Sequence, residues 1–359
     1  MILNMGPAHP ATHGTVRLII EVDGERIERC DVDLGYLHRG FEKMCETVDY
    51  NQVMPYTDRL NYVSPICNNV GYAIAIEKLF DVEVPKRAQY IRVVLSELSR
   101  MCDHLTCVGA GAMELGAFTV MLYLMQAREY LYELIEEVTG ARLTISYCRV
   151  GGLRDDLPEG FAEGLKQRFE KIRVHLADAD RLISRNRIFQ DRMSGIGIIA
   201  KDEAIGYGLT GPIGRASGID YDVRKAFPYS SYEDFDFDVP LGTKGDNLDR
   251  FLVRFNEIYE SMKIVEQAME NMPDGPIKID DPKIVMPPKD EVYGSIEGGN
   301  GELGFHVVSD GSAKPFRVRV RPPSFISMGI MGPLVEGHTI ADVVPLFGMI
   351  NMIGGECDR

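Results

Sequence analysis

The sequence predicts a mostly helical α+β fold, because strand-like patterns occur near both ends and helix-like patterns fill the long middle. Residues 15–36 contain two alternating apolar runs joined by an Asp-Gly pair, which is typical of a β-hairpin. Between about 70 and 272, apolar residues recur at helical spacing. Residues 301–322 return to strand alternation around a second Asp-Gly turn.

Three regions are expected from these changes of pattern. Residues 1–60 form an N-terminal β-containing region, residues 61–272 a helical bundle, and residues 273–359 a mixed α/β region. A chain of 359 residues is long enough for two or three domains and for a large core. The contents of 45% hydrophobic and 26% charged residues are typical of a globular protein and exclude a disordered or fibrous chain.

The helix predictions rest on apolar periodicity and on prolines that interrupt it. The predicted helices cover residues 71–80, 87–107, 158–187 and 246–272. Pro158 is placed in the first turn of its helix, where a missing N–H costs little. Residues 273–300 are rich in Pro, Gly and Asp and are expected to form a long loop.

Residues 105–127 stand out because they contain no Lys or Arg and a single acid, Glu114. Their length would suffice to cross a bilayer. Three glycines and the lack of flanking basic asymmetry favour a helix buried all round within the bundle. In either case apolar surroundings should raise the pKa of Glu114, and such carboxylates are often functional.

Charge and cysteine usage exclude several classes of protein. With 39 basic and 54 acidic residues, the net charge of -15 repels phosphate backbones, so no nucleic-acid partner is expected. The seven cysteines form no Cys-x-x-Cys pair, and the N-terminus does not resemble a secretory signal, which favours a reducing compartment. Cys102 and Cys107 flank His104 but lack a second half-site, so we predict buried thiols and no metal site.

Two histidines project from the loop GPAHPATHG at residues 6–14. Prolines and glycines stiffen this loop just before a predicted strand. His9 and His13 are either incidental surface residues of a turn or part of a functional loop. If they are functional, proton transfer is the obvious use, because histidine exchanges a proton near neutral pH.

Two further segments, GYLHRGFEK at residues 35–43 and YTDRLNYVS at residues 56–64, each combine an arginine with an acid. Arg–carboxylate pairs that tie loops to the core are the favoured interpretation. Tyr62 differs because its phenol, with a reference pKa of about 10, can donate to a carbonyl while keeping its proton.

The glycines of GNGELG at residues 299–304 match the spacing of a dinucleotide-binding fingerprint. That fingerprint requires a strand before it and a helix after it. Here a strand-like pattern follows, so we predict a hairpin turn.

Several motifs resemble, in order along the chain, those of one family. It is the 49-kDa-type (D-type) subunit of proton-pumping NADH–quinone oxidoreductase (respiratory complex I), which is related to the large subunit of nickel–iron hydrogenases. The matching motifs are GPAHPATHG, GYLHRGFEK, DRLNYVS, ELGAFT, GARLT, LTGPIGRASGIDYDVRK and the terminal GGECDR. The resemblance spans the whole chain and implies a hydrogenase large-subunit-like fold with a central helical bundle.

The resemblance implies that this chain binds no cofactor itself. Together with the B-type iron–sulfur subunit it would form the closed end of a cavity where quinone is reduced, next to the [4Fe–4S] cluster of that neighbour. The C-type subunit and the membrane-arm subunits would be further partners, and electron transfer would be coupled to proton translocation. The expected location is peripheral, on the cytoplasmic face of a bacterial inner membrane or on the mitochondrial matrix face.

By the same resemblance, His13 and Tyr62 are the residues that contact the quinone head, and Glu114 is the acid that partners His13. The family usually has Asp at that position, so the side chain here is one methylene longer. His9 of the same loop is expected to contribute to binding.

Two more residues are expected beside the neighbour's cluster. Arg39 corresponds to the family's positively charged neighbour of the cluster. Thr144 stands where many members have a histidine. Because Thr144 cannot titrate, the cluster is expected to have a lower and less pH-dependent potential.

Three alternatives compete with this assignment. A nickel–iron site needs four thiolates from two Cys-x-x-Cys pairs, and the lone Cys67 and Cys357 exclude it. A non-catalytic scaffold subunit would not need His13 and Tyr62. The same quinone site fed by ferredoxin or a deazaflavin donor remains open, because this chain binds no donor.

Overall fold

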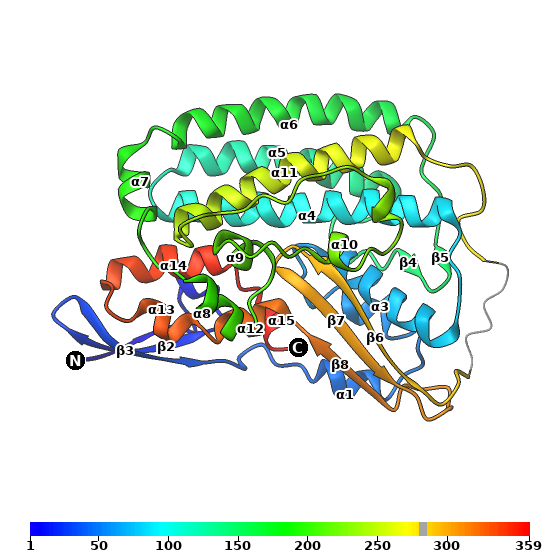
Figure 1. Ribbon diagram of the computed structural model, residues 1–359, viewed down its shortest axis with the longest axis horizontal. Coiled ribbons are helices and arrows are strands. Elements are labelled where there is room, and N and C mark those ends of the chain that lie inside the picture. The colour runs from blue at the N-terminus through cyan, green and yellow to red at the C-terminus, as the bar shows by residue number, and fades with distance from the viewer. Residues whose placement is uncertain (280–285) are drawn as a thin grey trace.

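The computed structural model describes residues 1–279 and 286–359, and it is mostly helical with three small sheets. Long helices form a layer that covers one side of the molecule, and two separate three-stranded sheets lie on the other side (Figure 1). The predicted α+β class is confirmed.

The N-terminal sheet consists of β1 (Ile2–Met5), β2 (Arg17–Asp23) and β3 (Arg26–Asp33), all antiparallel in that order. The hairpin predicted for residues 15–36 is therefore confirmed, and β1 extends it by one strand. The short 3₁₀ helix η1 (Pro10–Thr12) lies in the connection between β1 and β2.

Four long helices make the bundle, and a fifth, α3 (Pro65–Phe80), lies beside it. The four are α4 (Lys86–Glu114), α5 (Phe118–Thr139), α6 (Phe161–Ile183) and α11 (Asn247–Glu270). Helix α4 packs against both α5 and α11, and α6 covers α5 from outside (Figure 1). The Asp246 carboxylate caps α11 by accepting from the Asp249 N–H, which explains the sharp start of that helix.

The prediction of one buried helix over residues 105–127 is wrong. Helix α4 ends at Glu114, and α5 begins at Phe118 after a reversal at Gly116, whose φ of 88° is left-handed. Glycine adopts this conformation at little cost, so it ends the helix despite the continuous apolar run. Phe118 and Leu122 are 57% and 54% exposed, so the segment is not buried all round. Among the helices in the described part of the chain, none is long and apolar enough to cross a membrane.

Two other predicted boundaries need correction. The helix expected from residue 158 begins at Phe161 and ends at Ile183, so Pro158 precedes it. Part of the loop expected over residues 273–300 is strand β6 (Glu291–Gly298), because Val292, Ile296 and their neighbours pack toward the core. Residues 280–285 of that segment lie outside the described part of the chain.

Strands β6, β7 (Gly301–Val308) and β8 (Arg317–Arg321) form the C-terminal antiparallel sheet. Helix α3 packs against β6 and β7. The GNGELG segment joins β6 to β7, with Gly298 paired to Gly301, so the predicted hairpin turn is confirmed.

The remaining elements are short. They are α1 (Phe41–Cys45), α2 (Met54–Thr57), β4 (Cys148–Arg149), β5 (Gly152–Leu153), α7 (Arg187–Met193), α8 (Lys201–Gly206), α9 (Gly211–Ala216), α10 (Val223–Ala226), η2 (Tyr232–Asp234), α12 (Pro323–Met328), α13 (Met331–Val335), η3 (Ile340–Asp342), α14 (Val343–Ile350) and α15 (Gly354–Cys357).

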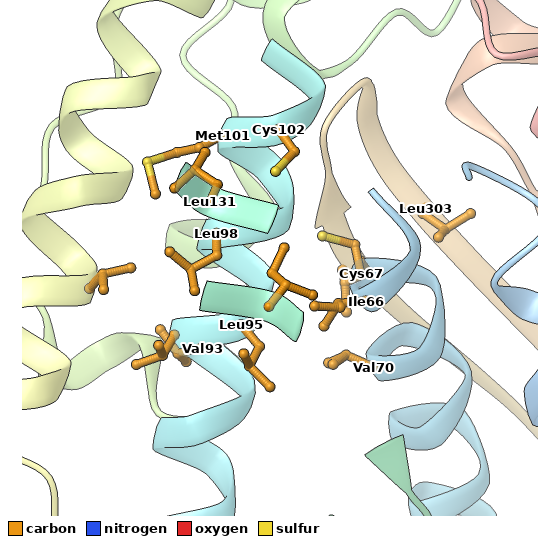
Figure 2. Close-up of a cluster of buried hydrophobic side chains, with 14 of the residues drawn as sticks. Ile66, Cys67, Val70, Val93, Leu95, Leu98, Met101, Cys102, Leu131 and Leu303 are labelled. Carbon is orange, nitrogen blue, oxygen red and sulfur yellow. The ribbon is translucent and has the colours of Figure 1, made fainter. Parts of the chain in front are cut away.

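Two hydrophobic cores hold these elements together. The larger lies between α3, α4, the bundle and the C-terminal sheet, and Figure 2 shows Ile66 and Val70 of α3 facing side chains of α4. The smaller joins the N-terminal sheet to α13 and α14. Residues from the two ends of the chain therefore share one core, which brings the N-terminal loop next to the C-terminal segment.

Candidate active site

The C-terminal segment Met352–Asp358 is where the loops that carry the predicted site residues meet. The loop of residues 6–15 reaches it through His13, whose Nδ1 donates to the Met352 carbonyl oxygen at 2.9 Å. The loop of residues 35–40 reaches it through Arg39, whose Nη2 donates to the carbonyl oxygens of Gly355 at 3.3 Å and Arg59 at 2.7 Å. Side chains far apart in the sequence are thereby held around one short stretch of backbone.

The Asp358 carboxylate fixes the second of these loops. Its two oxygens accept from the backbone N–H groups of Gly35 at 3.0 Å and Leu37 at 2.8 Å. The His38 Nδ1 donates to the Asp358 carbonyl oxygen at 2.6 Å. These three bonds hold the chain just before Arg39 in a defined position.

His13 occupies a strained position at the end of η1. Its φ of 53° is left-handed, which is uncommon outside glycine and is often found at functional sites. The ring packs edge-on against Phe347 of α14, with centroids 5.1 Å apart. Although the side chain reaches the surface, surrounding protein atoms lower the pKa of His13 by desolvation, and the Met352 carbonyl partly opposes this. Because Nδ1 donates, the neutral ring has its lone pair on Nε2.

His9 has a structural role in the same loop. Its Nδ1 accepts from the Ala11 N–H at 3.1 Å and so caps η1. Gly6 is required where the loop begins, because its φ is 93° and a side chain there would collide with the Val16 carbonyl. The loop is therefore stiff, as its composition predicts, and His9 helps to shape it.

Tyr62 follows a backbone stretch that contacts the terminal segment. The carbonyl groups of Arg59 and Leu60, just before it, lie against Gly355 of α15. The Tyr62 residue is 37% exposed. Partial burial raises the pKa of Tyr62, and the nearby Arg39 guanidinium acts in the opposite direction. Tyr62 therefore keeps its proton at neutral pH and can donate it in a hydrogen bond.

Glu114 is the last residue of α4 and lies against α14. Its Oε2 is buried and accepts no hydrogen bond from the residues that the structure describes. Burial raises the pKa of Glu114 to about 7. A carboxylate with this pKa changes protonation near neutral pH, which is the property required of a proton donor or acceptor.

The structure does not bring every predicted residue into contact. Within the described chain, no hydrogen bond joins His13 to Glu114; helix α14 contacts each of them instead. Thr144 is exposed, with a left-handed φ of 46°, in the loop after α5. That loop is tied to the Tyr62 segment at one point, where the Ser146 N–H donates to the Asp58 carboxylate at 2.8 Å.

Two buried acids support the site; the sequence predicted Asp58 only as the acid of an Arg–carboxylate pair, and it did not predict Asp103. Asp58 is fully buried, and burial raises its pKa to about 6 against the opposing effect of Asn69 and the Ser146 N–H. Asp103 accepts hydrogen bonds at 2.8 Å from three side chains, which are those of Asn61, Ser64 and Asn351. The DRLNYVS motif contains both Asp58 and Asn61, so the motif was a signal for this network, whereas the Asn351 contact was not foreseeable.

The Cys102–His104–Cys107 group is not arranged around a common point. The His104 Nε2 lies 2.8 Å from the Glu257 carboxylate, on α11. Cys107 donates to the Gly348 carbonyl oxygen at 3.6 Å. Within the described residues, no cluster of three or more His, Cys, Asp or Glu side chains has the geometry to hold a metal ion. All seven cysteines are buried free thiols, which confirms the buried thiols predicted at Cys102 and Cys107.

Cys67 and Cys357, the two cysteines that bear on the hydrogenase alternative, are among these buried thiols. Cys67 is fully buried, and burial raises the pKa of its thiol to about 12. The thiol pKa of Cys357 is also raised by burial. Both are therefore protonated thiols at neutral pH.

Comparisons with known proteins identify the family. A family model described as "Respiratory-chain NADH dehydrogenase, 49 Kd subunit" matches residues 114–298 and 286–359, which is more than half of the chain. The chain belongs to this family.

Curated relatives extend the match to the full length. A D-type NADH-quinone oxidoreductase subunit of Sorangium cellulosum is 53% identical, over 100% of this chain and 95% of the relative. The D-type subunit of Myxococcus xanthus is 49% identical over 100% and 92%, and that of Pelobacter propionicus 47% over 100% and 95%. The resemblance predicted from the sequence motifs is confirmed.

Proposed function

We propose that this chain forms one wall of the quinone-reduction site of an NADH–quinone oxidoreductase, with His13 and Tyr62 as the groups that meet the quinone head. The observation that carries the proposal is the convergence of the His13 loop, Arg39 and the Tyr62 segment on residues 352–355. The side chains of His13 and Tyr62, which both carry a proton, thereby reach the surface next to the backbone of residues 352–355.

The exposure of these side chains supports a site completed by a neighbouring subunit. His13 is exposed and Tyr62 is 37% exposed. The cavity of about 440 Å³ beside the C-terminus is lined by other residues, among them His38, Arg317, Phe325 and Arg359. A pocket that excludes water around a quinone therefore requires a second protein surface against His13 and Tyr62. The B-type iron–sulfur subunit would supply that surface, and the C-type subunit and the membrane-arm subunits would complete the assembly.

The reaction is the reduction of a quinone to a quinol by two electrons and two protons. The electrons would come one at a time from a [4Fe–4S] cluster held by the neighbouring subunit. Tyr62 donates a hydrogen bond to one quinone oxygen as negative charge develops there and then passes its phenolic proton to that oxygen, after which water reprotonates Tyr62. His13, with Nδ1 held by Met352, takes a proton on Nε2 and delivers it to the other oxygen.

Glu114 is the proton reservoir in this scheme, because its raised pKa of about 7 lets it both hold and release a proton near neutral pH. Arg39, exposed beside Tyr62, and Thr144 would face the cluster-bearing neighbour. We also propose that this electron transfer is coupled to proton translocation, and that the chain lies peripherally on the cytoplasmic face of a bacterial inner membrane.

The test uses the assembled complex with Tyr62→Phe or His13→Gln. We expect each change to lower NADH oxidation by quinone about a hundredfold, because one donor to the developing negative charge is lost. Oxidation by an artificial acceptor that takes electrons before the cluster should be unchanged.

Matched controls are Tyr293→Phe and His306→Gln, which remove exposed groups on the C-terminal sheet. Both should retain full quinone turnover. Normal quinone turnover in Tyr62→Phe and His13→Gln would refute the assignment.

A further inference from the structure

Helix α14 lies between the two proton-bearing groups and contacts both of them. Its Phe347 ring packs on His13, and Met352, just beyond the end of the helix, accepts from the His13 Nδ1. Its Gly348 lies against Glu114 on the other side. In Figure 1, α14 lies between the bundle and the N-terminal sheet.

The contact between α4 and α14 runs along one face of α4. Asp103, Cys107, Gly111 and Glu114 recur at spacings of three and four residues, so they share that face. Each of them has a partner in or just beyond α14. Asp103 accepts from Asn351 at 2.8 Å, and Cys107 donates to the Gly348 carbonyl at 3.6 Å. Gly111 lies against the terminal methyl group of Met349.

The contact between Glu114 and α14 is the last in this row. It is possible only because Gly348 has no side chain. A Cβ atom at Gly348 would lie 2.7 Å from the Glu114 Oε2, closer than van der Waals contact allows. The atom that would have to move is the end of a flexible side chain, so the helices themselves would not need to separate. A side chain at residue 348 would therefore displace the carboxylate specifically.

We propose that Gly348 is a positioning residue for Glu114: by lacking a side chain, it lets the carboxylate rest on α14, next to the residue that holds the His13 ring. The inference rests on the proposed function, because it assumes that Glu114 exchanges protons during quinone reduction. Under this inference, helix α14, which contacts both Glu114 and His13, sets the distance between them.

Few other charges act on Glu114 at this position. Helix α14 has no titratable residue between Val343 and Ile350. On α4 the nearest titratable group is Cys107, whose pKa is raised by burial to about 11, with Arg254 of α11 opposing. His13 lies across α14. The protonation of Glu114 therefore responds mainly to how deeply α14 buries it.

The test compares Gly348→Ala, Glu114→Asp and the double variant in the assembled complex. We expect Gly348→Ala to lower quinone turnover about tenfold, because small displacements of an acting group are costly. In the profile of quinone turnover against pH, the pKa on the acidic side should fall by about one pH unit, because the displaced carboxylate is less buried. In the double variant, the shorter aspartate side chain at position 114 withdraws from the new methyl group, so turnover should return to within about twofold of Glu114→Asp alone.

Gly111→Ala is the matched control, because it adds a methyl group at the same helix contact but meets Met349 and not Glu114. It should keep wild-type turnover and pH profile. An equal loss in Gly111→Ala, or no recovery in the double variant, would overturn the inference and leave the proposed function standing. Unchanged turnover in Glu114→Gln would overturn the proposed role of Glu114, and this inference with it.

Discussion

Helix α4 carries two glutamates in opposite surroundings. Glu97, in the middle of the helix, is fully buried, and its carboxylate accepts from Arg100, Arg224, Tyr232 and Ser261. Burial alone would raise its pKa, but the two arginines outweigh burial and lower it to about 2. Glu114, at the end of the same helix, has no such partner among the described residues, and burial raises its pKa to about 7.

The difference separates a structural charge from one that we propose to be functional. The Glu97 cluster continues into Asp222, Arg215, Glu257 and Glu297, so its three arginines all lie against buried carboxylates. These ion pairs hold α4, α9, α10, α11 and β6 together, and the pKa of Glu97 lies far below neutral pH. The Glu114 Oε2, in contrast, accepts no hydrogen bond from the described residues, and it lies beside the helix that holds His13.

The largest effect is expected from neutralising Glu97. Glu97→Gln leaves Arg100 and Arg224 buried without their main counter-charge, which should cost about 3–5 kcal/mol of folding free energy. We expect the complex not to assemble at normal levels, as measured by blue native electrophoresis.

The matched control for this prediction is Glu266→Gln, which breaks an exposed pair with Arg173, 2.6 Å apart. It should cost less than about 1 kcal/mol. Equal assembly of the Glu97 and Glu266 variants would mean that the buried cluster is not structural.

In contrast to Glu97→Gln, the Glu114→Gln complex should assemble normally but lose quinone turnover by about tenfold or more. Its effect on stability also has a definite sign. The folded state binds the Glu114 proton more tightly than the unfolded chain, so wild-type stability falls as pH rises from about 4.5 through about 7.

Glutamine cannot ionise, so the variant should be more stable than wild type above pH 7, by about 1–3 kcal/mol. Thermal unfolding of the two complexes at pH 6 and pH 8 measures this. A wild-type complex that gains stability relative to Glu114→Gln on going to pH 8 would contradict the assigned surroundings of Glu114.

The smallest effect concerns Thr144, which cannot titrate. If residue 144 faces the neighbour's cluster, Thr144→His should make the cluster potential more pH-dependent, toward about 60 mV per pH unit. An EPR redox titration of the wild-type and variant complexes at several pH values tests this. A wild-type potential that already varies steeply with pH would refute it.

Local patterns in the sequence predicted the elements better than the contacts between them. Alternation and Asp-Gly turns placed β2, β3, β7 and β8, and apolar periodicity placed the long helices. The break at Gly116 was missed because the apolar run continues through it. Strand β6 was missed because it follows a loop rich in Pro and Gly.

The site was predicted in its residue types but not in its geometry. Motif resemblance selected His13, Tyr62 and Glu114, and their quinone-site roles remain predictions. The partners of His13, Met352 and Phe347, are more than 330 positions away in the sequence, and no local pattern links them to it. The contact between Glu114 and Gly348 depends on how two helices pack, which a single sequence does not specify.

The most direct test of the central claim is the ratio of quinone-dependent to artificial-acceptor-dependent NADH oxidation in the purified, assembled complex. The comparison is wild type against Tyr62→Phe, with Tyr293→Phe measured alongside. The account predicts a ratio about a hundredfold lower in Tyr62→Phe and unchanged in Tyr293→Phe. A ratio in Tyr62→Phe equal to that of the wild type would contradict it.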